Sequence, residues 1–320
     1  MQIITGVAGF IGSNLAQHFL DAGENVLGVD NFVLGTPKNI ADLRSYSTFT
    51  FSEFDVTDRV KMTAFLNLIS SEERERTIVW HMAANSDISA GILDINVDYK
   101  NTLESTVSVL QAMKNTGLDK LMFASSSAIY GDRNGLPMAE NEGPYLPISN
   151  YGAMKLASEA IISAATESFL TTSFIYRFPN VVGERLTHGV IYDFAKKLSR
   201  NTGKLEVLGD GSQRKPYLYI GDLITAMLSA AEADRSEKIN IFNIAADGEG
   251  TSVKEIAELM VQMSPGKTEV RYGSSNKGWV GDVSKVTYDL TKIREIGWVS
   301  KLSSSEAVAL AAEWAVKNVR

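Results

Sequence analysis

The sequence of 320 residues contains no cysteine. This absence excludes disulfide bonds, thiolate nucleophiles and cysteine-ligated metal centres together. Histidine is almost as scarce, because only His18, His81 and His188 occur and they are far apart in the chain. Their spacing does not match a zinc-binding motif, in which ligands recur at short fixed intervals. We therefore expect no metal site.

An excess of basic residues is also lacking. Lys and Arg total 31 against 38 Asp and Glu, which gives a formal charge of −7 and an isoelectric point near 5.2. A nucleic-acid-binding surface needs clustered cations to neutralise phosphates, so no nucleic-acid partner is expected. The sequence enters its first apolar segment at once, without a signal-peptide pattern, and no apolar run is long enough to span a bilayer. We expect a cytoplasmic protein without a membrane partner.

Short apolar segments alternate with helical stretches through the first half of the chain. These segments lie near residues 2–5, 25–29, 48–54, 78–82, 120–125 and 173–177. Alternation of this kind predicts an α/β fold with a Rossmann-like, doubly wound parallel sheet. Ligands bind such folds at the carboxyl ends of the strands.

A glycine-rich turn follows the first predicted strand. Gly6, Gly9 and Gly12 have the spacing G-x-x-G-x-x-G, with Phe10 and Ile11 opening the next helix. The first glycine permits a tight turn, the second lets the backbone approach a pyrophosphate, and the third allows close packing of the helix. This pattern predicts a dinucleotide-binding turn, although an ordinary strand-to-helix connection could also be rich in glycine.

Asp30 ends the second predicted strand, at about the place where an adenosine ribose arrives after one strand–helix–strand unit. A carboxylate there accepts hydrogen bonds from a free 2′-hydroxyl and repels a 2′-phosphate. The residue therefore predicts NAD rather than NADP as cofactor. Alternatively, Asp30 could cap the turn that begins at Asn31.

Tyr151 and Lys155 are four residues apart in a predicted helix, so they lie on one face of it. An ammonium beside a phenol is expected to lower the pKa of the phenol by favouring the phenolate, which creates a general base. Such a pair also occurs by chance on exposed helices. Its position after a nucleotide-binding turn favours the catalytic interpretation.

Three further motifs follow predicted strands in order. They are Asp55-Val56, His81-Met82-Ala83-Ala84 and Ser125 to Gly131. Together with the glycine turn, Asp30 and the Tyr151/Lys155 pair, they resemble the extended short-chain dehydrogenase/reductases over essentially the whole chain. The branch they resemble most is that of the nucleotide-sugar epimerases and dehydratases, with the UDP-glucose 4-epimerases as the nearest type.

The resemblance implies a set of NAD-binding residues. These are Gly6, Gly9, Phe10, Ile11, Gly12, Asp30, Asn31, Asp55, Val56, Ala83, Ala84, Tyr151 and Lys155. Asp55 and Val56 would contact the adenine, the two alanines would line the cofactor, and Tyr151 with Lys155 would reach the nicotinamide ribose. The alternative for each is a role at a strand end or in the core.

The resemblance also identifies a catalytic serine. In the family a Ser or Thr lies four residues before the tyrosine of a Tyr-Gly pair, and counting back from Tyr130 gives Ser126. Ser126 would donate a hydrogen bond to the reacting sugar oxygen as a carbonyl forms. The 4,6-dehydratases have Thr-Asp-Glu at this position, whereas this chain has Ser126-Ser127-Ala128. A dehydratase is disfavoured because the acid and base of the elimination are missing.

Substrate contacts are implied by two later stretches. Asn180 matches the asparagine that contacts the diphosphate of a nucleotide sugar, and the family's diphosphate arginine falls at Lys215, with Arg214 one residue earlier. The classical epimerases carry a second arginine just upstream of the segment at Gly281-Asp282. Here Trp279 and Val280 stand in that place, which argues against UDP-galactose or UDP-glucose as the substrate. Alternatively, Trp279 packs under a loop and Lys277 or Arg185 supplies the charge.

Two domains follow from these assignments. Residues 1–177 are predicted to form the NAD-binding Rossmann domain, with a return strand near 241–245, and residues 178–320 to form a smaller α/β substrate-binding lobe. In that lobe, short segments are expected at 204–208 and 268–272, with helices near 189–200, 252–263 and 304–318.

The predicted activity is an NAD-dependent epimerisation at C4 of a nucleotide-diphosphate sugar through a transient 4-keto intermediate. A one-way 4-dehydrogenase or reductase would use the same Ser126, Tyr151 and Lys155, and a non-catalytic dinucleotide-binding protein could share the fold. Sequence alone does not separate the first two.

A homodimer is expected from two helical stretches, 92–116 and 151–168. Their apolar residues include Leu103, Val107, Leu110, Leu156, Ala160, Ile161 and Ala164. In the family that the chain resembles, these helices pair with those of a second copy in a four-helix bundle with two-fold symmetry. Alternatively, the chain's own sheet covers these faces.

Overall fold

The computed structural model describes residues 1–233, 237–276, 278, 283 and 286–319. The chain forms two compact units. Unit 1 comprises Met1–Ile129, Leu146–Arg177 and Ala231–Phe242, and unit 2 comprises Tyr130–Tyr145, Phe178–Ala230 and Asn243–Arg320. This grouping differs from the predicted division into 1–177 and 178–320 in two places: the stretch 130–145 groups with the second unit, and 231–242 with the first.

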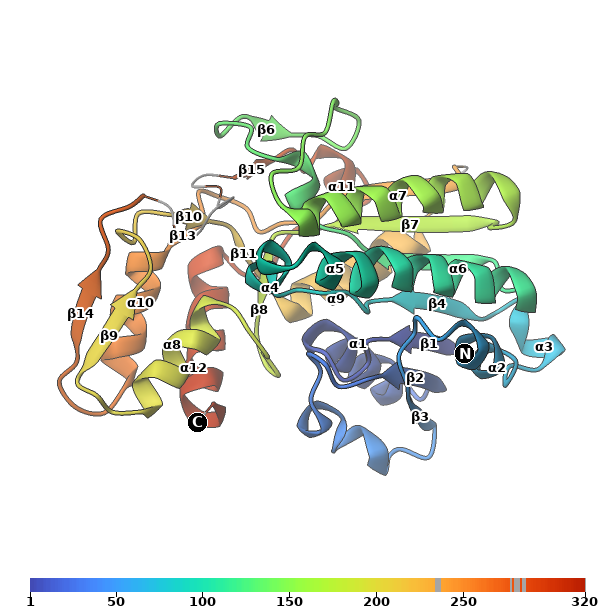
Figure 1. Cartoon of the computed structure of the whole chain (residues 1–320), viewed down its shortest axis with the longest axis horizontal. Helices are drawn as coiled ribbons and strands as arrows, with labels where there is room; N and C mark the ends of the chain where they lie inside the picture. Colours follow the sequence, from blue (N-terminus) through green and yellow to red (C-terminus); the bar gives the residue numbers. More distant parts are fainter. Residues whose placement is uncertain (234–236, 277, 279–282, 284–285, 320) are drawn as a thin grey trace. The chain divides into compact units, whose positions relative to one another are not determined.

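Unit 1 is built on a seven-stranded sheet (Figure 1). Its strands are β1 (Gln2–Thr5), β2 (Val26–Asp30), β3 (Phe49–Glu53), β4 (Ile78–His81), β5 (Lys120–Ala124), β7 (Thr172–Arg177) and β12 (Ile239–Asn243). The strand order is β12-β7-β5-β4-β1-β2-β3, and β1 to β5 and β7 pair in parallel. The order reverses between β1 and β4, where a doubly wound sheet binds its ligands. The predicted Rossmann-like fold is confirmed.

The helices of unit 1 are α1 (Phe10–Asp21), α2 (Arg59–Leu66), α3 (Ser71–Arg74), α4 (Ile88–Leu93), α5 (Ile95–Asp98), the π-helical turn η3 (Tyr99–Glu104), α6 (Ser105–Thr116) and α7 (Asn150–Ser168). The single helix expected over 92–116 is therefore wrong. Asp94 is extended, with φ −143° and ψ 111°, and its carboxylate accepts a hydrogen bond from the backbone N–H of Asn96. Aspartate competes in this way with helix continuation.

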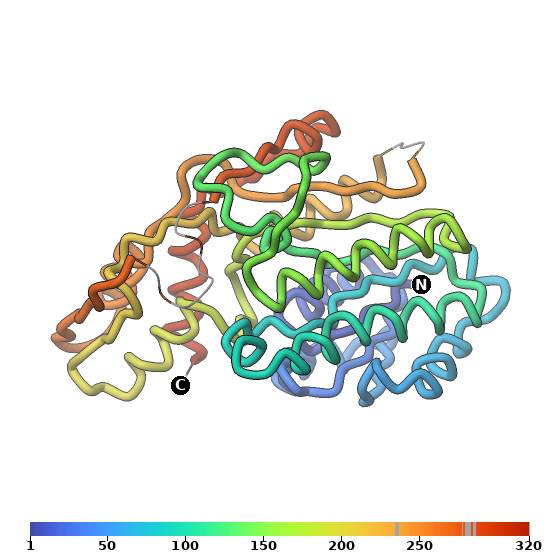
Figure 2. Tube along the Cα trace, turned by 45° about the horizontal axis from the view of Figure 1, so that its top comes forward, coloured from blue at the N-terminus to red at the C-terminus, as the bar shows by residue number. Residues whose placement is uncertain are grey.

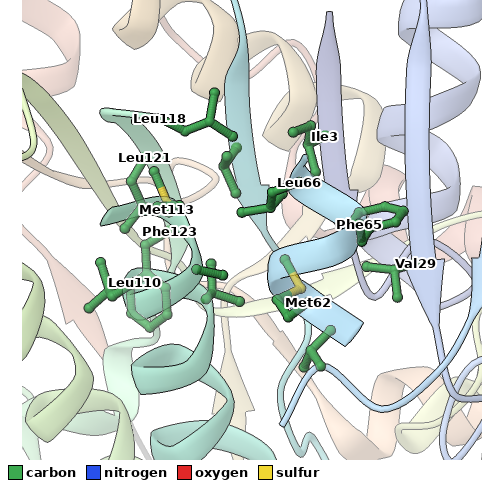
Figure 3. Close-up of a cluster of buried hydrophobic side chains, with 14 of the residues drawn as sticks. Ile3, Val29, Met62, Phe65, Leu66, Leu110, Met113, Leu118, Leu121 and Phe123 are labelled. Atoms are coloured by element: carbon green, nitrogen blue, oxygen red, sulfur yellow. The ribbon is translucent and has the colours of Figure 1, made fainter. Parts of the chain in front are cut away.

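A hydrophobic cluster fills the space between the sheet and two helices (Figure 3). Ile3, Val29 and Leu121 enter it from the strands. Helix α2 contributes Met62, Phe65 and Leu66, and helix α6 contributes Leu110 and Met113. Each such side chain stabilises the fold by about 1.5–3 kcal/mol on full burial. This core fixes the strands whose carboxyl ends carry the motifs.

Unit 2 consists of short strands and amphipathic helices, and Figure 2 allows its chain to be followed by colour. Its elements are β6 (Pro137–Met138), β8 (Asn180–Val182), α8 (Val190–Ser199), β9 (Lys204–Val207), β10 (Arg214–Lys215), β11 (Tyr217–Tyr219), α9 (Ile220–Glu232), β13 (Thr251–Ser252), α10 (Val253–Met263), β14 (Glu269–Tyr272), β15 (Thr287–Tyr288), α11 (Thr291–Glu295) and α12 (Ser304–Asn318). Strands β9 and β14 pair in parallel. Ser252 and Ser303 begin α10 and α12 with capping boxes. In the part of the chain that the structure describes, no helix combines the length and apolar character needed to cross a membrane.

Candidate cofactor and catalytic site

The glycine turn after β1 requires glycine for steric reasons. Gly6 has a φ of +70°, and a Cβ on it would lie 2.8 Å from the backbone nitrogen of Ala83. A Cβ on Gly12 would lie 2.2 Å from the carbonyl oxygen of Gly6. The turn therefore packs closely against both the start of α1 and the segment after β4, and larger residues would push these apart.

The amino terminus of α1 is suited to an anion. Its N-cap is Gly9, which offers no side-chain hydrogen bond, and its first turn contains no acidic residue. The first backbone N–H groups of a helix lack intrahelical partners and attract negative charge. Phe10 is buried and Ile11 is half-buried at this helix start. A glycine cradle followed by an uncapped helix end fits the pyrophosphate of a dinucleotide.

Asp30 lies at the carboxyl end of β2 and is 7% exposed. Its Oδ2 accepts a hydrogen bond from Ala8 N at 2.9 Å, and its Oδ1 accepts one from Phe32 N at 2.8 Å. Burial raises the pKa of this carboxyl, while the bonds from Phe32 and Ala8 oppose the rise. Asp30 thus caps its own turn, as does Asn31, whose Oδ1 accepts from Val33 N. The backbone N–H groups of Asn31 and Gly9 also act on this carboxyl, so a ribose hydroxyl would share its oxygens with the turn.

Asp55 and Val56 follow β3. The Asp55 carboxylate accepts two hydrogen bonds from Thr57 and lies 3.1 Å from the ammonium of Lys100. Although burial raises the pKa of Asp55, these bonds from Thr57 and Lys100 outweigh it and leave the pKa lowered. Val56 belongs to the hydrophobic cluster. Its side chain therefore has a core role, whatever contact its backbone makes.

The end of β4 is tied to β1 through Thr5. The Thr5 hydroxyl lies 2.8 Å from Nδ1 of His81 and accepts a hydrogen bond from the backbone N–H of Ala83. Burial, together with the charge of Lys155, lowers the pKa of His81 to about 3, so the ring is neutral at working pH. Ala83 and Ala84 are half-buried. This arrangement holds the alanine pair beside the glycine turn.

Ser126 and Tyr151 are hydrogen-bonded to each other through their side chains. Tyr151 lies in the first turn of α7, which Ser149 caps by accepting from Gly152 N at 3.1 Å. A Cβ on Gly152 would lie 2.4 Å from the carbonyl oxygen of Ala128. Because position 152 is glycine, the start of α7 can pack directly against the turn that carries Ser126. Sequence analysis missed this requirement, although Gly152 directly follows Tyr151.

Ser125 has a different role from Ser126. Its hydroxyl donates to Oε1 of Glu159 at 2.5 Å in the interior. Glu159 is paired with Arg177, whose Nε and Nη2 donate to the carboxylate at 3.0 and 2.6 Å. This buried ion pair was also missed. Its sequence signal is the position of Glu159 four residues after Lys155, on the same face of α7.

Lys155 is buried beneath the site. Its Nζ donates to the carbonyl oxygen of Ala124 at 2.5 Å and lies 5.9 Å from the centre of the Tyr151 ring. Burial lowers the pKa of Lys155 to about 7, and the charge of Glu159 opposes this shift.

The predicted lowering of the Tyr151 pKa by Lys155 is wrong for the protein by itself. Burial raises the pKa of Tyr151 to about 12; the hydrogen bond with Ser126 lowers it, and the charge of Asp98 raises it further. The ammonium is directed at Ala124 rather than at the phenol. The burial of Tyr151 therefore has a larger effect on its pKa than the proximity of Lys155 has.

The candidate substrate residues lie in unit 2. Asn180 is exposed at the start of β8, where it pairs in register with Tyr217. Arg214 donates from Nη1 to Gly250 O at 2.7 Å, and its Nη2 lies 3.0 Å from Glu255. Lys215, the next residue of β10, is half-buried. Successive side chains of a strand point to opposite faces, so Arg214 and Lys215 cannot serve the same site in one conformation.

Trp279, Val280, Gly281 and Asp282, which mark the departure from the classical epimerases, lie outside the described residues.

Known proteins are similar to this chain over most or all of its length. The sequence pattern of the NAD dependent epimerase/dehydratase family matches residues 2–245. A putative UDP-glucose 4-epimerase of Methanocaldococcus jannaschii is 27% identical, with 100% of both chains covered. A crystal structure of UDP-galactose 4-epimerase is 33% identical with a TM-score of 0.84, again over 100% of both chains.

A second solved structure is that of UDP-glucuronic acid 4-epimerase from Bacillus cereus in complex with UDP-glucuronic acid and NAD. It is 26% identical, has a TM-score of 0.86 and covers 99% of each chain. The matched family region includes the glycine turn, Asp30, Ser126, Tyr151 and Lys155. The chain belongs to the NAD-dependent epimerase/dehydratase family, and NAD is its cofactor.

Proposed function

We propose that the protein is an NAD-dependent epimerase that inverts C4 of a nucleotide-diphosphate sugar through a transient 4-keto intermediate. The observation that carries this proposal is the Ser126–Tyr151 hydrogen bond above Lys155, in the same compact unit as the glycine turn of the cofactor site. The names of the relatives support it, because those above are 4-epimerases of UDP sugars. The absence of acids at Ser127 and Ala128 continues to disfavour a dehydratase.

The cofactor would be held by the residues around the β1–β4 switch point. The start of α1 would bind the pyrophosphate, Asp30 the adenosine ribose, and Tyr151 with Lys155 the nicotinamide ribose. When bound, NAD⁺ supplies the acceptor for the C4 hydride, and its positive nicotinamide ring favours the phenolate form of Tyr151.

Tyr151 would act as the general base that takes the proton of the C4 hydroxyl. Ser126 would donate a hydrogen bond to the same oxygen as it becomes a carbonyl. After the keto sugar has turned over, Tyr151 would return the proton to the oxygen while the opposite face of C4 takes back the hydride, and together these would yield the inverted alcohol. Such a cycle has no net redox change, so the cofactor can remain bound throughout.

For the diphosphate, we favour Lys215 over Arg214. The diphosphate position implied by the family resemblance falls at Lys215, and β-strand alternation directs its side chain to the face opposite to that of Arg214, which contacts Gly250 and Glu255. Lysine would bind the phosphates as a point charge rather than bidentately. Asn180 would contribute a neutral hydrogen bond to the same group.

Ligand identity can be tested by mass spectrometry of small molecules released from the purified protein. The proposal expects NAD together with a nucleotide-diphosphate sugar or its 4-keto form. Release of NADP, or of a ligand without a sugar diphosphate, would count against it.

Discrimination against NADP is expected to depend on Asp30. Replacing Asp30 by alanine should narrow the gap between the NAD and NADP dissociation constants, because it removes both the repulsion of a 2′-phosphate and the ribose hydrogen bond. The lost hydrogen bond alone corresponds to about 1–3 kcal/mol, or roughly fivefold to 150-fold in Kd. Calorimetric titration of the apoprotein with each dinucleotide measures the ratio.

Asp58→Asn is the matched control, since it removes a nearby surface acid while keeping the N-cap of α2. It should leave the ratio unchanged. Equal affinity of the unaltered protein for the two dinucleotides would show that Asp30 does not select the cofactor.

We further propose a homodimer formed by α6 and α7, which pack side by side in unit 1 (Figure 1). Leu110 and Ile161 pack in the chain's own core and are unavailable. Leu103, Val107 and Leu156 are half-buried, and Ala160 and Ala164 are exposed. These five leave an apolar surface that a second copy would cover in an isologous contact.

Replacing Leu156 by lysine is therefore expected to shift the mass in light scattering from twice 34.9 kDa to 34.9 kDa. Burying an unpaired charge in an apolar contact is costly, which drives dissociation. Val60→Lys on α2, at a position 80% exposed, should leave the dimer intact. A monomer mass for the unaltered protein at micromolar concentration would overturn the assignment.

A further inference from the structure

Asp98, the last residue of α5, carries a buried carboxylate that the assigned roles do not use. The residue is 1% exposed. Its Oδ1 accepts a hydrogen bond from Nδ2 of Asn85 at 2.6 Å, whereas its Oδ2 has no hydrogen-bond partner among the described residues. A buried carboxylate oxygen without a partner carries a desolvation cost of about 1–3 kcal/mol or more. The Asp98 carboxylate is therefore expected to have a function or to be held in place by its surroundings.

The unpartnered oxygen rests against the backbone of Gly91. A Cβ at that position would lie 1.8 Å from Oδ2 of Asp98, so only glycine fits there. The carbonyl oxygen of Gly91 in turn accepts a hydrogen bond from Nδ2 of Asn150 at 2.8 Å. Asn150 is the first residue of α7 and directly precedes Tyr151. Two contacts therefore connect the Asp98 carboxylate to the helix start that carries the phenol.

The charge of Asp98 acts on the phenol. It raises the pKa of Tyr151, in addition to the larger effect of burial. Burial also raises the pKa of Asp98, a rise that Asn85 opposes and the charge of Asp87 increases. An ionised Asp98 and an ionised Tyr151 therefore disfavour each other, as two acids in one partly desolvated site do.

Other charged groups on the elements packed around Tyr151 are accounted for. Lys155 lies below the ring and donates to a backbone carbonyl. On α7 and β7, Glu159 and Arg177 neutralise each other. On η3, Lys100 is paired with Asp55. The remaining η3 acid is Glu104, His81 of β4 is neutral, and Asp94 lies exposed before α5.

We propose that Asp98 is a positioning residue for Tyr151: its carboxylate fixes Gly91 against the start of α7 and places a negative charge near the phenol. The proposal rests on the proposed function, in which Tyr151 is the general base. Asp98 would hold the contact of Gly91 with the start of α7 and would oppose formation of the Tyr151 phenolate.

The test is a titration of the Tyr151 phenol by nuclear magnetic resonance. Full-length protein is prepared with tyrosine isotopically labelled at the phenol carbon, and the Tyr151 signal is identified by its loss in Tyr151→Phe. The shift is followed against pH with NAD⁺ at saturation. In Asp98→Asn the midpoint should fall by about one pH unit, which is about a tenfold larger ratio of phenolate to phenol at fixed pH.

Asp94→Asn is the matched control. It removes one exposed negative charge from the same segment, and asparagine can keep the N-cap of α5 that Asp94 provides. The Tyr151 midpoint should stay in place. Asp98→Ala is measured in parallel. Because alanine has no amide, its result does not depend on the asparagine amide of Asp98→Asn, which would lack a hydrogen-bond partner.

An unchanged midpoint in both Asp98 variants would overturn the proposal. So would a phenol that stays protonated in every variant throughout the pH range of the folded protein. The titration uses no sugar, so a lowered midpoint without epimerase turnover would retain the role of Asp98 and refute only the proposed function.

Discussion

Replacing Tyr151 by phenylalanine is expected to lower turnover of a nucleotide sugar by about 10²–10⁴-fold, the usual contribution of a general base. The substitution removes only the hydroxyl that is hydrogen-bonded to Ser126. The ring remains packed at the start of α7, so NAD binding should change little. Single-turnover measurement of C4 inversion, with the cofactor content determined separately, checks both expectations.

Two comparisons make the result specific to the assigned site. Ser126→Ala should also slow turnover, whereas Ser127→Ala, one residue along the same turn, should keep it close to the unaltered rate. Near-normal turnover in Tyr151→Phe would show that another group removes the C4 proton.

Replacing Arg177 by methionine is expected to destabilise unit 1 by about 3–5 kcal/mol, the usual effect of breaking a buried ion pair. Arg177 and Glu159 are 2% and 6% exposed at their side chains, so the carboxylate would be left in the interior with Ser125 as its remaining side-chain hydrogen-bond donor among the described residues. Denaturant titration of the folded protein measures the loss in the free energy of unfolding.

The double substitution Arg177→Met/Glu159→Leu is the control for this pair. Replacing both charged partners by apolar side chains removes the unpaired charge, so the double variant should be more stable than Arg177→Met alone. If the two substitutions instead add independently, the pair is not energetically coupled.

The sheet could be predicted from sequence because its strands are short apolar runs bounded by turn residues. The strand expected at 2–5 is observed at Gln2–Thr5, and the return strand expected near 241–245 is β12, Ile239–Asn243. Buried parallel strands have a strong local signal of this kind. The glycine turn could also be predicted from sequence, because the positive φ of Gly6 and the close approach of Gly12 to the Gly6 carbonyl both require residues without a side chain.

The electrostatics of the site could not be predicted from local pattern. A spacing of four residues placed Lys155 on the same helix face as Tyr151, but its Nζ is directed at Ala124. The phenol also meets the charge of Asp98, which is distant in sequence and is held there by packing on Gly91. Desolvation depends on the whole tertiary arrangement, so the direction of the Tyr151 shift became visible only in the fold.

The break in the helix expected over 92–116 has a similar origin. Asp94 lies within that expected helix, although aspartate favours an N-cap. Its extended conformation starts α5 anew and brings Asp98 into the interior. The signal in the sequence was Asp94 itself, because its side chain can accept a hydrogen bond from the nearby backbone and so begin a new helix.

The most direct test of the central claim is an isotope experiment on C4. UDP-sugars carrying deuterium at C4 are incubated with the purified protein, and the products are examined by nuclear magnetic resonance and mass spectrometry. The account predicts a C4-inverted product that retains the deuterium, with no net accumulation of NADH. Accumulation of a 4-keto sugar with stoichiometric NADH, or loss of the deuterium to solvent during inversion, would contradict it.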